Sequence, residues 1–306
     1  MFPIIPANSV AEEAGNSEGI FGFGRIAPSV YSITNLVSNA GVVATDDAGV
    51  GTARTALAAC SYGGDKGIFG YGNTPGQHSM TNLISNAGVV ATDVTGVGTA
   101  RSSIAACSYG GDKGIFGYGH SGVYTSYTNL VSNAGVVATD TTGVGTARLG
   151  LAACSYGGDK GIFGFGYLPA PTDGGTAITN KVSNAGVVAL DTAGVGTARY
   201  YIAACSYGGD KGIFGFGTSG TGGEQSTTNL VSNAGVVATD TTGIGTGRSN
   251  LAACGYGGDK GIFGFGYYNP PGLWSVTNLV SNAGVVASDT AGVGSAREGP
   301  AGCSFN

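Results

Sequence analysis

Short runs of alternating apolar and small residues, separated by turns of glycine, asparagine and aspartate, recur along the chain. In residues 248–296 these runs read LAACGYG, KGIFGFG, TNLVSN and GVVASDT. The GGDK segment after the first run and the SNAG segment after the third are typical of tight hairpin turns. Each unit therefore predicts four antiparallel strands, A to D, that pair in sequence order.

The unit occurs six times, with a spacing of 47 to 51 residues between equivalent cysteines. A period near 45 residues is typical of propeller blades, of kelch-like units or of long helical repeats. Helical repeats are disfavoured because each unit contains about ten glycines, and glycine costs about 1 kcal/mol per helical position relative to alanine. We therefore predict an all-β protein, a six-bladed β-propeller with four antiparallel strands per blade.

The predicted blades follow the repeat boundaries. They cover residues 54–100, 101–147, 148–198, 199–247 and 248–296, and a sixth blade combines residues 297–306 with residues 18–53. The segment REGPAGCSFN is a strand A without its strand B, and SEGIFGFG near the N-terminus is a strand B without its strand A. We expect the C-terminal strand A to pair with N-terminal strands B to D, which closes the ring and removes two sheet edges. We expect residues 1–17 to form an N-terminal tail.

Strand alternation gives the glycines a packing role. In strand B of the fifth unit it predicts that Phe263 and Phe265 point to one face, and that Ile262, Gly264 and Gly266 point to the other. Because propeller blades pack face to face, we expect the aromatic rings of one blade to lie over the glycines of the next.

Composition narrows the classes of protein. Sixty of 306 residues are glycine, but 42% are hydrophobic and there is no G-X-Y triplet, which excludes collagen and argues against a disordered chain. The net charge of -5 leaves no basic surface for a nucleic acid. No apolar run reaches the ~20 residues of a membrane span, and the N-terminal segment lacks the basic and apolar regions of a secretory signal peptide. We therefore expect neither Sec-type export nor a transmembrane anchor.

The blade pattern resembles kelch-type propellers. It has an arginine shortly before strand A, an aromatic and glycine-rich strand B that ends in FGFG or FGYG, and a C–D hairpin. It departs from the kelch pattern at VVATD, where a tryptophan is usual, and at GFG, which replaces the glycine doublet. The segment TNLVSNAGVVATDTTGVGTAR is also similar to near-identical propeller repeats of marine phage and metagenomic proteins. That resemblance implies a virion structural or tail-associated protein, so we expect a virion or cytoplasmic location.

The six cysteines allow two interpretations. They follow the LAAC pattern of strand A, at residues 60, 107, 154, 205, 254 and 303. A ring of thiols or a metal site lining the central shaft is one interpretation. The other, which we favour, is a small buried apolar side chain, because no paired Cys or His ligands have zinc spacing and splayed strands do not bring cysteines within disulfide range.

One aspartate and one arginine recur in every unit. The aspartates are Asp46, Asp93, Asp140, Asp191, Asp240 and Asp289, and the arginines are Arg54, Arg101, Arg148, Arg199, Arg248 and Arg297. A pair such as Asp140 with Arg148 is a candidate acid and cation of a pocket, and calcium bound by the aspartates is a further alternative without a DxDxDG loop to support it. We favour a structural role, in which the aspartate caps backbone amides of its own DTTG loop and the arginine ties the D-to-A connection to a neighbour. No metal or other cofactor is predicted.

The two histidines, His78 and His120, occupy different B-to-C segments, and no nucleophile or carboxylate partner is evident for either. We interpret them as surface residues. GFGTSGTGG satisfies a loose glycine-loop pattern, but it follows a hairpin strand and opens no helix, so a phosphate-binding loop is rejected.

Variation between the copies is concentrated in the B-to-C segments and just after the repeat arginine. In an up-and-down blade these two connections emerge on the same face of the disc, so we predict a binding face there, with relaxed drift of the loops as the alternative. Its candidate residues are Tyr31, His78, His120, Tyr124, Tyr127, Tyr167, Tyr200, Tyr201, Tyr267, Tyr268 and Trp274.

We therefore predict a non-enzymatic binding or structural module, a virion-associated propeller that recognises a protein or a glycan through one loop face. A free lectin-like or kelch-like adaptor is the alternative. A propeller hydrolase or lyase is a third possibility, disfavoured because no carboxylate or histidine cluster stands apart from the repeats. Nucleic acid and membrane are not expected partners.

Overall fold

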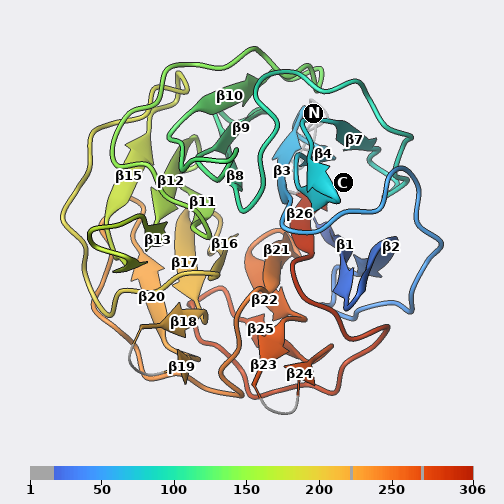
Figure 1. Ribbon diagram of the computed structural model, residues 1–306. Coiled ribbons are helices and arrows are strands. Elements are labelled where there is room, and N and C mark those ends of the chain that lie inside the picture. Colours follow the sequence, from blue (N-terminus) through green and yellow to red (C-terminus); the bar gives the residue numbers. More distant parts are fainter. Residues whose placement is uncertain (1–16, 221–222, 270–271, 306) are drawn as a thin grey trace, which may run out of the picture.

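The chain is all-β. The computed structural model describes residues 17–220, 223–269 and 272–305, and every regular element within these ranges is a β-strand (Figure 1). This confirms the fold class predicted from the alternating pattern.

Six three-stranded antiparallel sheets carry the repeats, and each consists of an inner, a middle and an outer strand. The inner strands are β3 (Ala58–Tyr62), β8 (Ala105–Tyr109), β11 (Ala152–Tyr156), β16 (Ala203–Tyr207), β21 (Ala252–Tyr256) and β26 (Ala301–Phe305). The middle strands are β4 (Lys66–Gly70), β9 (Lys113–Gly117), β12 (Lys160–Gly164), β17 (Lys211–Gly215), β22 (Lys260–Gly264) and β1 (Glu18–Ile26). The outer strands are β7 (Thr81–Ile84), β10 (Thr128–Val131), β15 (Thr179–Val182), β20 (Thr228–Val231), β25 (Thr277–Val280) and β2 (Ser29–Val37).

The sheet that joins the two ends of the chain has the predicted pairing. β26 pairs antiparallel with β1, from Gly22 opposite Ala301 to Glu18 opposite Phe305, and β1 pairs in turn with β2. The inner strand of this sheet therefore comes from one end of the sequence and its middle and outer strands come from the other. Both edges of β1 are covered, as expected.

The inner strands follow one another around a common centre (Figure 1). Each inner strand contacts the inner strand of the next repeat, from β3 through β8, β11, β16 and β21 to β26, and β26 contacts β3.

The fourth predicted strand is not a continuous strand. In each repeat this segment makes only two isolated bridges with the outer strand, such as Val280 with Val286 and Thr277 with Thr290. Asn278 replaces part of the ladder, because its side-chain amide donates to the carbonyl of Ala287 and to Asp289. The prediction of four continuous strands per blade was therefore wrong. The fourth segment keeps a few backbone hydrogen bonds to the outer strand, such as those between Thr277 and Thr290, and the Asn278 side chain bonds the stretch between them.

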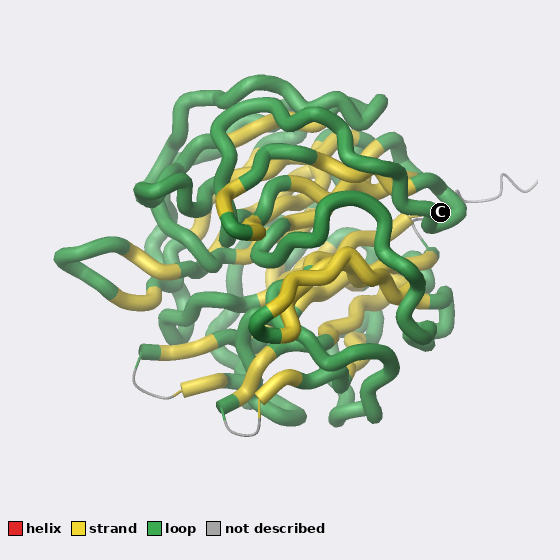
Figure 2. The backbone as a smooth tube through the Cα atoms, turned by 45° about the vertical axis from the view of Figure 1, so that its right-hand side comes forward, coloured by secondary structure: helices red, strands yellow, loops and turns green. Residues whose placement is uncertain are grey.

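Two-residue strands form short hairpins in four of the segments between middle and outer strands. They are β5 (Asn73–Thr74) with β6 (Gly76–Gln77), β13 (Tyr167–Leu168) with β14 (Gly174–Gly175), β18 (Thr218–Ser219) with β19 (Gly223–Glu224), and β23 (Tyr267–Tyr268) with β24 (Gly272–Leu273). These hairpins project from one side of the molecule, away from the C-terminal end (Figure 2).

Neighbouring sheets pack through an aromatic ring over a glycine, as predicted. A Cβ placed on Gly215 of β17 would lie 2.8 Å from Phe263 Cζ of the next sheet. The same fit joins Gly22 to Phe69, Gly70 to Phe116, Gly117 to Phe163, Gly164 to Phe214 and Gly264 to Phe21, with separations of 2.6–3.0 Å. No other residue leaves room for the ring at these positions, so the glycines set the spacing of the sheets.

The two aromatic residues of each FGFG segment point to opposite faces, which corrects the prediction for Phe263 and Phe265. Phe263 contacts Phe216 of the preceding repeat at 5.1 Å between ring centroids, whereas Phe265 contacts Phe21 of the following sheet at 5.4 Å. The backbone leaves the strand conformation at Phe265, where φ is 64°. Strand alternation therefore stops one residue earlier than the sequence pattern indicates.

Candidate functional site

The variable segments lie side by side on one face of the molecule. The residues that follow the repeat arginines form bridges with the segments between middle and outer strands: Ser102 with His120, Leu149 with Tyr167, and Tyr200 with Thr218. We call this surface the loop face. It comprises residues 25–31, 71–80, 118–127, 165–178, 216–227 and 265–276, where described, and the two residues after each repeat arginine.

Four tyrosines from three repeats lie near one another on the loop face, and three of them are in ring contact. The rings of Tyr167 and Tyr200 are 4.8 Å apart, and those of Tyr200 and Tyr201 are 5.2 Å apart, both in edge-to-face geometry. Tyr124 is close enough to act electrostatically on both Tyr167 and Tyr201. The hydroxyl of Tyr167 donates a 2.9 Å hydrogen bond to Asp173 Oδ1. We call Tyr124, Tyr167, Tyr200 and Tyr201 the tyrosine cluster.

The pKa of two tyrosines in the cluster, Tyr167 and Tyr201, is raised above its ordinary value. The hydrogen bond to Asp173 raises the pKa of Tyr167, since loss of the phenolic proton would place two negative charges together. Burial raises the pKa of Tyr201, with smaller contributions from Tyr124, Tyr200 and Glu298. The cluster therefore presents partly buried rings, hydroxyl donors and one carboxylate at the same place.

His120 extends this arrangement. Its ring is 5.6 Å from that of Tyr124, and its Nδ1 is 3.2 Å from the Gln77 side-chain amide nitrogen. Its polar contact is thus an amide rather than a hydroxyl or carboxylate. The structure therefore brings together five of the predicted site residues.

The other predicted site residues do not make ring contacts with the tyrosine cluster in the described part of the chain. Tyr31 and Tyr127 are exposed, at 37% and 40%. The remaining four are half-buried, namely His78, Tyr267, Tyr268 and Trp274. His78 Nε2 and Trp274 Nε1 are buried without a hydrogen-bond partner. His78 was interpreted as a surface residue, and its buried ring nitrogen corrects that interpretation.

Backbone hydrogen bonds connect the repeats in a closed cycle beneath the loop face. The amide of Ser103 donates to the carbonyl of Ala56, the amide of Gly150 to Ser103, and the amide of Tyr201 to Gly150. Asn250, Gly299 and Ala56 continue the cycle, each donating to the residue before it, with all six bonds between 2.6 and 3.0 Å. All six residues have φ between 51° and 61°. This cycle fixes Tyr201 at the end of the central channel.

The channel between the inner strands is lined in layers. The end below the loop face is lined by large apolar residues, including Leu57, Ile104, Leu151, Ile202 and Leu251. Alanines and then the six cysteines follow toward the opposite end. All six cysteines are buried and free. Burial raises the thiol pKa, to about 12 for Cys107, Cys205 and Cys303. The cysteines thus behave as small buried side chains, in agreement with the interpretation that we favoured.

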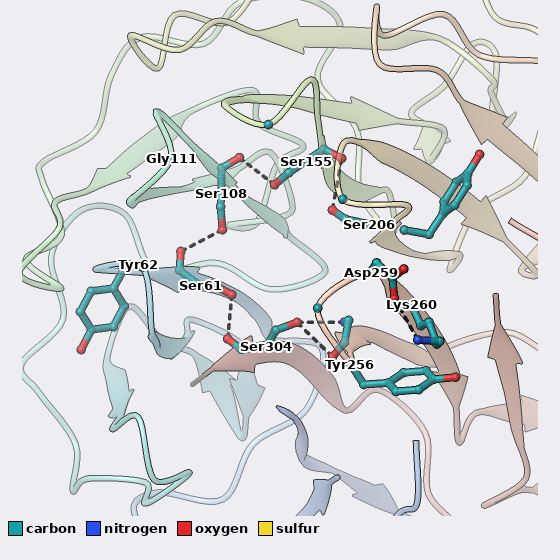
Figure 3. Close-up of a pocket in the computed structure, with 16 residues that line it drawn as sticks. Ser61, Tyr62, Ser108, Gly111, Ser155, Ser206, Tyr256, Asp259, Lys260 and Ser304 are labelled. Carbon is teal, nitrogen blue, oxygen red and sulfur yellow. Dashed lines mark hydrogen bonds and ion pairs between the residues drawn. The ribbon is translucent and has the colours of Figure 1, made fainter. Parts of the chain in front are cut away.

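Serine residues surround the opposite end of the channel (Figure 3). The hydroxyl of Ser108 donates to the carbonyl of Ser61 at 2.9 Å, and the hydroxyl of Ser155 donates to the carbonyl of Ser108 at 3.0 Å. Ser206, Ser304 and Ser61 continue this pattern, and Gly255 occupies the sixth position. Each serine therefore ties its inner strand to the preceding one.

The repeat arginines and aspartates form internal networks, as the structural interpretation predicted. Arg101 is fully buried, donates through Nε to the carbonyl of Tyr118 at 2.9 Å, and lies over the Tyr71 ring of the preceding repeat at 4.6 Å. Its Nη1 is 3.4 Å from Asp140 Oδ1. All six arginines lie over such an aromatic ring.

The suggested partnership of Asp140 with Arg148 was wrong. Asp140 faces Arg101 of its own repeat, and it accepts bonds from the amide and hydroxyl of Thr99, at 2.9 and 2.6 Å. The amide that it caps therefore belongs to the connection before Arg101, not to the DTTG loop that follows Asp140. Burial alone would raise the pKa of Asp140, but the hydrogen bonds from Thr99 and Asn129 lower it. Burial lowers the pKa of four of the arginines to about 10: Arg54, Arg199, Arg248 and Arg297.

Comparisons with known proteins identify no relative: no family model matches the chain, and no curated protein is significantly similar to it. Across the described ranges, no group of three or more His, Cys, Asp or Glu side chains is arranged to hold a metal ion. In the same ranges no helix is long and apolar enough to cross a membrane.

Sequence reasoning missed three polar residues of the loop face. Asp173 bonds Tyr167, and Arg25 donates from Nε and Nη2 to Glu298 Oε1, at 2.9 and 2.6 Å. Arg25 also lines an open hollow with Pro28, Thr55 and Pro75. The sequence does contain a signal for these three residues, because charged residues do not occur at the equivalent positions of the other copies. The loop face can therefore bind a ligand in three ways: by stacking on tyrosine rings, by hydrogen bonds from hydroxyl groups and by hydrogen bonds to carboxylates.

Proposed function

We propose that the six sheets are the blades of a six-bladed β-propeller. The proposal is supported by six copies of one unit, by the contact of each inner strand with the next, and by the pairing of β26 with β1. The cycle of backbone hydrogen bonds through Ala56, Ser103, Gly150, Tyr201, Asn250 and Gly299 agrees with a closed ring. Propellers host many unrelated activities, so the function has to be argued from the site.

On this scaffold the chain acts as a non-enzymatic binding module whose loop face recognises a ligand. One observation carries the proposal: the segments in which the copies differ lie together on one face and place a tyrosine cluster there, whereas the framework below is repeated almost unchanged. Drift alone would scatter polar and small residues, without packing rings from two repeats against each other. Rigid aromatic residues among small polar groups are typical of recognition surfaces.

A glycan is the ligand that the tyrosine cluster fits best, and a protein surface is the second candidate. Sugar rings stack on aromatic faces, and their hydroxyls bond carboxylates and phenols such as those of Asp173 and Tyr200. The open hollow around Arg25 lies apart from the tyrosine cluster on the same face, and it favours a protein partner.

Binding to a glycan array tests this assignment. We expect Tyr167→Ala and Tyr200→Ala to weaken binding by about tenfold or more, because each removes a ring from the contact surface. The matched control is Tyr31→Ala, which removes an exposed loop-face tyrosine outside the cluster and is expected to leave binding unchanged. If all three variants bind like the wild type, the cluster is not the binding surface.

The resemblance to phage repeats leads us to propose further that the protein is attached to a virion. Mass spectrometry of purified particles is the direct measurement, and detection of the chain in them is the expected result. A protein that stays soluble and free of particles would instead favour the lectin-like or kelch-like adaptor.

A further inference from the structure

An open hollow of about 630 Å³ lies on the loop face between two neighbouring sheets, the one that joins the chain ends and the one of β3, β4 and β7. Residues 25 and 28–30, around the turn between β1 and β2, line it from one side. Residues 73–75, in the hairpin of β5 and β6, line it from the other, together with Thr55. Ligand sites in proteins typically have volumes of about 300–1,000 Å³. We call this space the Arg25 hollow.

The guanidinium of Arg25 is held in place but keeps a free edge. Glu298 Oε1 accepts hydrogen bonds from both its Nε and its Nη2, while in the described part of the chain its Nη1 has no acceptor. The Arg25 side chain is 49% exposed, whereas that of Glu298 is only 13% exposed. A guanidinium has five N–H donors in a rigid fork, so the hollow meets an oriented cation with donors to spare. Among the described residues of the loop face, Arg25 is the one arginine or lysine.

The framework does not need this ion pair. Arg25 and Glu298 form one of six equivalent backbone bridges, in which each amide donates to the carbonyl of the other residue. The other five bridges form without an arginine, a lysine or a carboxylate: Thr55–Asn73, Ser102–His120, Leu149–Tyr167, Tyr200–Thr218 and Ser249–Tyr267. The charged pair therefore adds a chemical group to the surface at a position that folds equally well without it.

The lining of the Arg25 hollow fits a peptide better than a sugar. It contains no aromatic ring, so a sugar finds no face on which to stack, in contrast to the tyrosine cluster. Pro28, Val30 and Pro75 offer apolar contacts to the aliphatic part of a side chain, and Asn73 and Thr74 offer amide and hydroxyl groups to a peptide backbone. A guanidinium with a free edge recognises a carboxylate through charge-assisted hydrogen bonds.

We propose that the Arg25 hollow binds an acidic peptide segment of a partner protein, with an Asp or Glu carboxylate of that segment on Arg25. The carboxylate accepts from Nη1, while Glu298 keeps the Nε and Nη2 bonds that orient the guanidinium. The apolar part of the segment packs on Pro28 and Pro75. This site rests on the proposed function only in that the loop face binds a ligand. It shares no lining residue with the tyrosine cluster and does not depend on what that cluster recognises.

Nuclear magnetic resonance titration of the full chain tests the proposal. The probe is acetyl-Ala-Glu-Ala-Glu-Ala-amide, and its counterpart with Gln in place of Glu is the neutral reference. We expect the acidic peptide to shift the backbone amide signals of Asn73 and Thr74 saturably, with a dissociation constant near or below about 1 mM. Arg25→Gln is expected to weaken this binding about tenfold, because it removes the charged donor.

Lys66→Gln is the matched control. Lys66 is also an exposed cation paired with a carboxylate, at 2.7 Å from Asp65 Oδ1, but it lies at the far end of β4 from the hollow, so binding is expected to stay unchanged. Glu298→Gln is expected to strengthen binding about threefold, because an amide oxygen still accepts from Arg25 while the competing negative charge is gone. A pair with a purely structural role would change the melting temperature of this variant and not its affinity.

Four results would overturn the proposal: equal binding of the neutral peptide, wild-type affinity in Arg25→Gln, no gain in Glu298→Gln, or tighter binding of glucuronic acid than of the acidic peptide. The last result would assign the hollow to an acidic sugar. Tyr200→Ala is expected to bind the peptide like the wild type, and Arg25→Gln is expected to retain glycan binding. These two variants therefore separate a failure at the Arg25 hollow from a failure of the proposed function at the tyrosine cluster.

Discussion

At the scale of single residues, glycines of the middle strands determine how closely the sheets approach. Gly215 illustrates the constraint, since the Phe263 ring occupies the place where a Cβ would stand. Phe263 is fully buried, so the ring has no free space into which it can move.

Gly215→Ala is therefore expected to destabilise the protein by about 1–3 kcal/mol through overpacking. Gly76→Ala is the matched control, because a Cβ at Gly76 meets no atom within 4 Å and its φ is not in the left-handed region. Its effect is expected to stay within about 0.5 kcal/mol. Chemical denaturation measures both free energies of unfolding, and equal effects of the two substitutions would contradict the packing role.

Prediction for single residues succeeded where strand alternation alone sets the direction of a side chain, and it failed where the backbone leaves the strand conformation. The alternation rule correctly placed Phe263 against a glycine of the neighbouring sheet. It failed at Phe265, because the left-handed backbone at that residue turns its ring to the other face, under Arg297. Nothing in a period-two pattern signals such a change of backbone conformation.

At the scale of elements, the sequence predicted the three inner positions of each unit well and the fourth poorly. GVVASDT alternates like a strand, yet Asn278 and Asp289 bond across the gap and leave two isolated bridges. The hairpins on the loop face were not predicted, since strands of two residues have no periodicity to detect. Closure by β26 was predictable, because the missing half of one unit is present at the other end of the chain.

Removing β26 is expected to expose the inner edge of β1 and to destabilise the whole molecule. A chain ending at Pro300 loses the pairing of Gly19 with Ser304 and of Ile20 with Cys303, together with the buried Phe305. We expect a loss of about 3 kcal/mol or more, since buried apolar side chains and five pairs of the ladder disappear together.

A synthetic peptide of residues 297–306 supplies the control. We expect it to bind the shortened chain and to restore the melting temperature, because it provides the same ladder in trans. A peptide with Cys303→Lys is expected to fail, since a charged side chain cannot enter the buried position of Cys303. Restoration by both peptides would show that the effect is not specific pairing.

At the scale of the whole molecule, the candidate site depends more on how the repeats are arranged in space than on which residues their variable segments contain. Tyr124, Tyr167 and Tyr200 belong to three repeats, and nothing in the sequence distinguishes them from Tyr31 or Trp274. The contact between the rings of Tyr167 and Tyr200 follows from the order of the sheets and from the hairpin of β13 and β14. A sequence pattern can therefore predict the face but not the part of it where rings meet.

The repeat aspartates act together, and their shared chemistry predicts how the molecule responds to acid. The pKa of all six is lowered below the ordinary value of 3.8: burial opposes the shift, but hydrogen bonds from a Thr or Ser and an Asn outweigh it. A carboxyl group whose folded pKa is below its unfolded pKa adds stability above the unfolded value, and this stability is lost as the pH falls through the folded value. The turn aspartates beside the lysines shift in the same direction.

We therefore expect stability to be retained from neutral pH to about pH 4 and to fall steeply below it, because six linked sites protonate in the same range. Asp140→Asn is expected to cost about 2 kcal/mol at neutral pH, since buried Arg101 loses its partner, and to make the loss of stability below pH 4 less steep. Asp47→Asn is the comparison, because that carboxylate bonds the Ala48 amide and faces no repeat arginine. Urea denaturation at a series of pH values measures both effects. The free energy of unfolding of Asp140→Asn could instead fall with pH, below pH 4, as steeply as that of the wild type. The acid sensitivity would then not arise in the repeated Asp–Arg networks that join the six sheets.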